Sequence, residues 1–138
     1  MPLRSLSDKR GFLTQVLPAI LYAVALFCLG VSHIALNVPQ GFVPQDKLTH
    51  FGAFGLLVWL AYRAFRFELG TAAVGQLVWL SIAASSSTGA LLEIWQSFFP
   101  YRSAEFADWV ADTLGAMVAG YAAFLWISWR KRQAAARE

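Results

Sequence analysis

Ionisable and polar side chains with helical spacing lie beside long apolar runs at three places in this sequence. They form three pairs, each three or four residues apart: Asp46 with His50, Glu93 with Gln96, and Asp108 with Asp112. Because residues three or four apart share one face of a helix, each pair presents both of its polar groups on the same side. Histidine and carboxylate side chains are the usual groups for general acid–base chemistry, so their clustering in an apolar chain predicts a functional site.

The candidate catalytic residues are His50, Glu93 and Asp108. His50 with either carboxylate has the composition of a base and its orienting partner, which suits hydrolysis or group transfer. The residues predicted to bind a ligand are Asp46, Lys47, Gln96, Arg102 and Asp112. We expect no cofactor and assign no metal ligands, because His, Glu and Asp without a compact motif such as H-E-x-x-H are a weak indication of a metal.

Each of these residues also has a structural interpretation. Glu105 and Asp108 lie where the last apolar helix begins, and acids at a helix start interact favourably with the helix dipole. His50 can be an interfacial histidine bonded to a neighbouring backbone group. We expect Arg102 to form a bidentate ion pair with Glu93 or Asp108, and such a pair can serve only to fix the loop.

The composition indicates an integral membrane protein. The chain has 138 residues, of which 58% are hydrophobic and 14% charged, whereas an ordinary soluble domain carries about 25% charged residues. No linker or repeat divides the chain, so residues 1–138 form one domain. The net charge is +3, but the basic residues gather at the ends of apolar runs and form no aromatic-interleaved patch, which argues against nucleic-acid binding.

Four apolar runs are predicted to cross the bilayer as helices, because about 20 apolar residues span its hydrocarbon core. They cover approximately residues 12–36, 48–65, 71–95 and 109–129. Small residues three and four apart in the last run, such as Gly115 with Ala119, indicate close helix packing. The fold class is therefore all-α, a four-helix transmembrane bundle.

The distribution of Lys and Arg predicts the orientation of this bundle. Most of them lie before the first run, between the second and third, and after the last, while the two other loops hold only Lys47 and Arg102. By the positive-inside rule both termini are cytoplasmic. We therefore expect a multi-pass protein of the bacterial cytoplasmic membrane, with His50, Glu93 and Asp108 at its outer face.

Three stretches of the chain resemble the VanZ-like family of small bacterial membrane proteins. They are DKLTHFGAFGLL from Asp46, GALLEIWQSFFPYRS from Gly89 and ADWVADTLGAMVAG from Ala107. In that family an Asp-Lys-x-x-His opening, a Glu-x-x-Gln helix end, an arginine after a proline turn and an aspartate at the start of the last helix recur in this order. The resemblance covers residues 46–120.

The resemblance points to seven residues of this chain: Asp46, Lys47, His50, Glu93, Gln96, Arg102 and Asp108. Two positions depart from the family pattern. The family commonly shows asparagine where this chain has Asp112, and glycine is frequent where it has Tyr101. The acid at position 112 adds negative charge unless it shares a proton, so the resemblance does not carry over a hydrogen-bonding role specific to asparagine.

The resemblance also implies a role at the outer cell surface. The family's named member is associated with resistance to teicoplanin, a glycopeptide that carries a fatty acyl chain. An outward pocket would bind an amphiphile, such as a lipid-linked cell-wall intermediate or a lipoglycopeptide, with Arg102 and Lys47 meeting an anionic group and apolar walls holding the tail. The alternatives are an intramembrane hydrolase or transferase acting through His50 and a carboxylate, and an assembly factor whose polar residues are only structural.

Overall fold

The computed structural model describes residues 6–32, 45–70 and 72–137, and in these ranges the chain is helical apart from turns. Three helical segments follow one another without a break at the N-terminal end: α1 (Leu6–Gly11), the π-helix η1 (Phe12–Val16) and α2 (Leu17–Gly30). Three long helices follow, α3 (Gln45–Glu68), α4 (Val74–Gln96) and α5 (Phe106–Ala135). The predicted all-α class is confirmed.

Four helical segments are long and apolar enough to cross a membrane: Asp8–Gly30, Gln45–Glu68, Val74–Gln96 and Phe106–Ala135. They correspond to the four predicted spans. The second and fourth are longer than their apolar runs, because a helix continues through its polar flanks. The first ends at Gly30, before the predicted residue 36, since Val31 leaves the helical conformation with φ −106° and ψ 2°.

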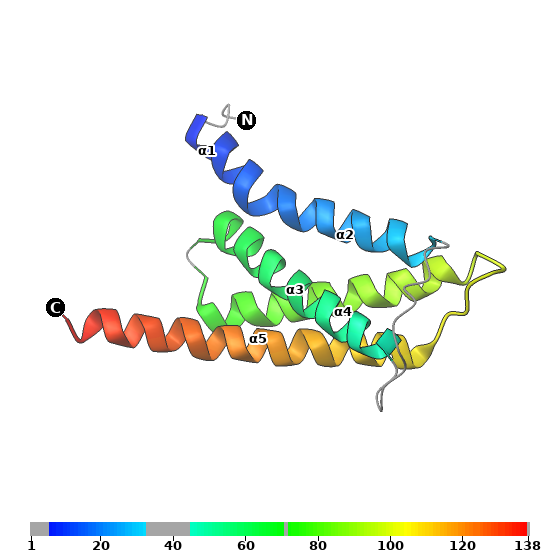
Figure 1. The fold of residues 1–138 in the computed structure, drawn as a ribbon. Coiled ribbons are helices and arrows are strands. Elements are labelled where there is room, and N and C mark those ends of the chain that lie inside the picture. The colour runs from blue at the N-terminus through cyan, green and yellow to red at the C-terminus, as the bar shows by residue number, and fades with distance from the viewer. Residues whose placement is uncertain (1–5, 33–44, 71, 138) are drawn as a thin grey trace.

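The start of α1 and the end of α5 lie at the same end of the bundle (Figure 1). At the opposite end, α2 and α4 finish and α3 and α5 begin. Four helical spans, an even number, bring the start of α1 and the end of α5 to the same end of the bundle. His33 and the proline-containing loop of residues 37–44 lie outside the described residues.

The first span contains a π-helical turn just before Pro18. Proline has no backbone N–H, so it cannot donate the usual hydrogen bond to the carbonyl oxygen of Thr14. The guanidinium of Arg63 on α3 donates to this oxygen instead, at 2.8 Å, and also donates to the Gln15 side chain at 3.1 Å. The irregular turn therefore attaches the first span to α3.

The remaining three helices form the packed centre of the bundle, and α3 packs most extensively against α5. A Cβ atom added at Gly115 of α5 would overlap the backbone carbonyl of Phe51 on α3. One turn further along, a Cβ at Gly55 would lie 3.4 Å from the Cβ of Ala119. The predicted role of small residues in close helix packing is confirmed at this crossing.

Two apolar clusters fill the interior. One joins α3, α4 and α5 through side chains that include Val58, Leu77 and Ile82. The other joins α3 and α4 through Phe54 and Leu92 and receives partly buried residues of α2. Many large apolar side chains remain exposed on the outside, among them Trp79, Phe98, Phe106 and Tyr121. Such an apolar exterior is what a lipid environment requires.

Substituting Gly115 with alanine should separate α3 from α5, because the added methyl group meets backbone atoms that cannot rotate away. We expect Gly115→Ala to lower the free energy of unfolding by about 2 kcal/mol, which is the usual cost of adding a group to a well-packed core. Thermal unfolding in detergent measures the effect. The matched control is Gly52→Ala on α3, where an added Cβ meets nothing within 4 Å. Equal stability of the two variants would contradict the close crossing.

Candidate functional site

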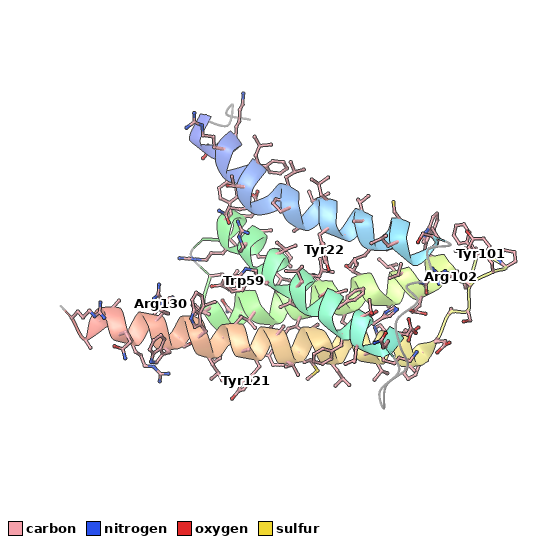
Figure 2. All side chains as sticks on the ribbon, viewed as in Figure 1. Tyr22, Trp59, Tyr101, Arg102, Tyr121 and Arg130 are labelled. Atoms are coloured by element: carbon pink, nitrogen blue, oxygen red, sulfur yellow. The ribbon has the colours of Figure 1, made fainter. Side chains whose placement is uncertain are left out.

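The predicted site residues lie at the end of the bundle where α4 turns into α5. Figure 2 shows Tyr101 and Arg102 at this end, beside the end of α2. Tyr101 donates from its hydroxyl to the carbonyl of Val31 at 3.1 Å, and Arg102 donates to the carbonyl of Ser32 at 2.6 Å. The segment between α4 and α5 is thereby fixed to the end of the first span.

His50 and Asp112 form the central contact of the site. His50 Nδ1 lies 2.8 Å from Asp112 Oδ1, and this contact joins α3 to α5. Asp112 is fully buried, whereas the His50 side chain keeps 15% of its surface exposed. An ionised Asp112 can only accept a hydrogen bond. Nδ1 of His50 would therefore carry the ring proton and donate a hydrogen bond to Asp112, and Nε2 would face other groups.

Two further carboxylates face the other ring nitrogen of His50. Nε2 lies 3.9 Å from Asp46 Oδ1 and 3.9 Å from Asp108 Oδ2. Asp46 comes from the preceding turn of the same helix and is largely exposed, while Asp108 comes from the first turn of α5 and is buried. The imidazole therefore lies between the buried carboxylate of Asp112 on its Nδ1 side and the carboxylates of Asp46 and Asp108 on its Nε2 side.

Lys47 supplies the positive charge for three carboxylates of the site, those of Asp46, Glu105 and Asp108. Its Nζ atom forms a very short contact with Asp108 and lies 2.9 Å from Glu105 Oε2 and 3.4 Å from Asp46 Oδ2. Glu105 was not predicted as a site residue. Its position three residues before Asp108, directly before α5 begins, is the signal that indicates it.

The expected ion pair of Arg102 with Glu93 or Asp108 is absent from the described part of the chain. The turn after α4 directs Arg102 toward the carbonyl of Ser32 at the end of α2. Lys47 reaches Asp108 because it lies in the first turn of α3, which packs against α5. Spacing along the sequence could not decide between the two cations, since the choice depends on the path of the turn.

Glu93 and Gln96, one turn apart at the end of α4, have different partners. Glu93 Oε2 accepts a hydrogen bond from the backbone N–H of Glu105 at 2.7 Å, so it satisfies a donor where α5 begins. Gln96 donates to the carbonyl of Gly30 at 3.0 Å and so binds the end of α2. The structure thus brings Glu93 into the polar cluster and places Gln96 at the cluster's edge.

Gly89 allows Asp112 to enter the interior beside α4. A Cβ added at Gly89 would lie 2.6 Å from Asp112 Oδ2 and 3.1 Å from Asp112 Cβ. No side chain larger than hydrogen fits here without moving the aspartate. Gly89 therefore makes room on α4 for a buried carboxylate.

Two adjoining cavities reach this cluster. The larger, of about 530 Å³, lies between α2, α3 and α4, and its apolar walls include Tyr22, Leu26, Leu29, Phe54 and Leu92. The smaller, of about 130 Å³, is polar and is lined by Asp46, His50, Gln96, Tyr101, Arg102, Ser103, Glu105 and Asp108. Four residues line both cavities, namely Asp46, His50, Gln96 and Arg102.

The cavity walls add residues that the sequence did not single out. Tyr22 of α2 points toward α3 in Figure 2 and donates from its hydroxyl to the carbonyl of Ala53 at 3.2 Å. Its position inside an apolar run gave no indication of this role.

Four apolar helices with a polar, largely buried cluster at one end define a multi-pass membrane protein. The chain matches the VanZ/LLP1 family over residues 6–128 and belongs to that family. The resemblance noted over residues 46–120 is thereby confirmed, and the match also includes the first span. No curated protein and no solved structure matches the chain.

Removing the ammonium group of Lys47 should destabilise the protein, because Asp108 would then be a buried carboxylate without its cation. We expect Lys47→Met to lower the free energy of unfolding by about 2 kcal/mol, a value reduced for partial exposure. Unfolding in detergent at neutral pH provides the measurement. Arg102→Met is the comparison, with a smaller loss, since Arg102 contacts a backbone carbonyl.

Combining Lys47→Met with Asp108→Asn should recover part of the loss, because the second change removes the unpaired charge. Additive effects of the two substitutions would mean that they do not interact.

Proposed function

We propose that this VanZ/LLP1 family protein binds an amphiphile whose polar head lies at the polar cluster and whose tail lies between α2, α3 and α4. The observation that carries the proposal is that two adjoining cavities share part of their walls. An apolar chamber and a polar chamber share Asp46, His50, Gln96 and Arg102 as common walls. A ligand that occupies both must be apolar at one end and polar at the other.

The larger cavity suits a hydrocarbon tail. Its volume of about 530 Å³ is in the range of about 300–1,000 Å³ that is typical of small-molecule sites. It lies beside α2, which contacts the other helices less than they contact one another. Leu26, Leu29, Phe54 and Leu92 offer the apolar surface against which a tail would be buried.

The polar residues favour a head that combines an anionic group with hydroxyl groups. Among the described residues, Arg102 uses one guanidinium nitrogen on the Ser32 carbonyl, and its further N–H donors suit a phosphate. Lys47 is engaged by three carboxylates and is the weaker candidate, in contrast to the role predicted for it. Asp46 and Glu105, which line the smaller cavity, are acceptors for hydroxyl groups. A lipid-linked glycan phosphate of the cell envelope combines these features.

A teicoplanin-type lipoglycopeptide is a second amphiphile that fits the same description, because it carries an acyl chain and sugars. Its support comes from the family resemblance alone. A phosphate, by contrast, is supported by Arg102 in the wall of the polar cavity.

The site faces outward in this proposal. Arg63 and Arg66 near the end of α3 lie at the same end of the bundle as the basic residues 130–132 of α5. The opposite end, which contains the polar cluster, has Lys47 and Arg102 as its basic residues among those that the structure describes. By the positive-inside rule, the arginine-rich end is cytoplasmic in the bacterial inner membrane.

Cysteine labelling tests this orientation. A Ser103→Cys variant should react with a membrane-impermeant maleimide added to intact spheroplasts, after Cys28, the single native cysteine, has been replaced by serine. A Gln133→Cys variant near the end of α5 should react only after the membrane is opened. The reverse pattern would place the polar cluster in the cytoplasm and contradict an external ligand.

Catalysis is the second candidate function, and the His50–Asp112 contact favours it. A carboxylate bound to Nδ1 orients an imidazole whose Nε2 is then the proton acceptor. His50 also lines both cavities, so Nε2 lies where the head of an amphiphile would be. Within this hypothesis the reaction is hydrolysis or transfer at the head of a lipid-linked substrate.

Photo-crosslinking tests the binding proposal. A photoreactive polyprenyl-phosphate-linked glycan should label the purified protein on residues of α2, α3 and α4. We expect Arg102→Gln to reduce the apparent affinity by about 10-fold or more, the effect of losing a charge-assisted hydrogen bond. His50→Ala should reduce it less. Arg130→Gln, which Figure 2 shows far from Arg102, is the control and should leave labelling unchanged.

The same preparation separates the two functions. Labelling that persists in His50→Ala while turnover of the probe disappears would favour the enzyme, and labelling without turnover in the native protein favours a binding protein. Leu26→Trp would fill the larger cavity. If this variant and Arg102→Gln both leave labelling unchanged, the proposed amphiphile site is refuted. Competition by teicoplanin would identify the lipoglycopeptide as a ligand.

A further inference from the structure

Two buried carboxylate oxygens in the polar cluster have no hydrogen-bond partner among the described residues. They are Glu93 Oε1 and Asp112 Oδ2. Glu93 is 8% exposed and Asp112 is 0% exposed, so bulk water does not replace the missing partners. Buried carboxylate oxygens are normally paired with a donor or a cation. This pair of oxygens is therefore placed to bind a donor or a cation.

His50 completes a set of potential metal ligands with these two acids. One atom from each of His50, Glu93 and Asp112 can be chosen so that all three lie within 4.8 Å of one another. The three residues come from α3, α4 and α5, whose packing fixes their mutual positions. Two ligand atoms of one zinc ion are at most about 4.2 Å apart, so only small side-chain rotations are needed to close the set.

We propose that His50, Glu93 and Asp112 bind a divalent transition-metal ion. Two carboxylates balance the charge of the ion, which makes the buried cluster neutral. An imidazole nitrogen among the ligands favours Zn²⁺ or a similar first-row ion over Mg²⁺ and Ca²⁺, which prefer oxygen ligands throughout. Bound there, the ion would connect three helices and fix the orientation of the His50 ring.

The neighbouring set of Asp46, His50 and Asp108 also has ligand atoms within 4.8 Å of one another, but it is a poorer cation site. Lys47 contacts both of its carboxylates and supplies their positive charge. Asp46 is also largely exposed to solvent. Glu93 and Asp112, in contrast, contact no lysine or arginine among the described residues, so the metal ion would be their cation.

The proposal does not rest on amphiphile binding, and it is measured without a lipid probe. The full chain is purified through an affinity tag that contains no histidine, treated with a chelator, reloaded with Zn²⁺ and washed. Elemental analysis should then find about one zinc ion per chain, the stoichiometry of one three-ligand site. Glu93→Gln and Asp112→Asn should each lower zinc affinity by more than about 100-fold, because partners outside the ligand set alone change it by 10–100-fold.

Matched variants separate this site from its neighbours. Asp46→Asn and His33→Ala should retain zinc, whereas His50→Ala, at the other of the two histidines in the chain, should lose it. Loss of zinc in Asp46→Asn with retention in Glu93→Gln would overturn the assignment. An unchanged zinc content in Asp112→Asn, with the variant monodisperse in detergent, would also overturn it.

A spectroscopic measurement on the native protein covers the case in which the variants do not fold. X-ray absorption at the zinc edge should show a single imidazole nitrogen together with carboxylate oxygens as ligands. A spectrum with oxygen ligands only would exclude His50 and contradict the proposal. Because neither measurement involves an amphiphile, failure of the metal site and failure of the proposed function have separate readouts.

Discussion

The close crossing of α3 and α5 beside His50 is the constraint on which the polar site depends. Gly115 has no side chain, so the backbone carbonyl of Phe51 lies against it where a Cβ would overlap. This approach places Asp112, three residues earlier on α5, at 2.8 Å from the imidazole. Gly89 of α4 gives the same aspartate room on its other side. Glycines on two helices therefore permit a carboxylate to be fully buried next to a histidine.

Around that crossing the charged groups divide into two layers. The outer layer contains the exposed Asp46 and Glu105 and the buried Asp108, which share the ammonium of Lys47. The inner layer contains Glu93 and Asp112, and His50 is its basic residue among those described. His50 contacts acids of both layers and lines both cavities, so it is the residue through which the two layers meet.

The sequence was sufficient to predict the four helices and the gathering of their polar residues at one end. A bilayer sets the length of an apolar helix, so successive spans return to the same level and bring distant residues together. It was not sufficient to assign the partners. Lys47 replaces Arg102 at Asp108, and Glu93 binds a backbone N–H, because the path of the turn between α4 and α5 decides which side chains meet. That path depends on tertiary contacts with α2, which no local pattern encodes.

The contacts to α2 also connect the proposed head site to the position of the first span. Gln96 binds the carbonyl of Gly30, the last residue of α2, which lacks a partner within the helix. Arg102 binds the carbonyl of Ser32, two residues beyond the helix. The same two side chains line both cavities. A phosphate at the remaining Arg102 donors would therefore bind to the same guanidinium that holds the Ser32 carbonyl. Because the guanidinium that would bind the proposed head also fixes the end of the first span, a displacement of that end would move a donor of the proposed head site.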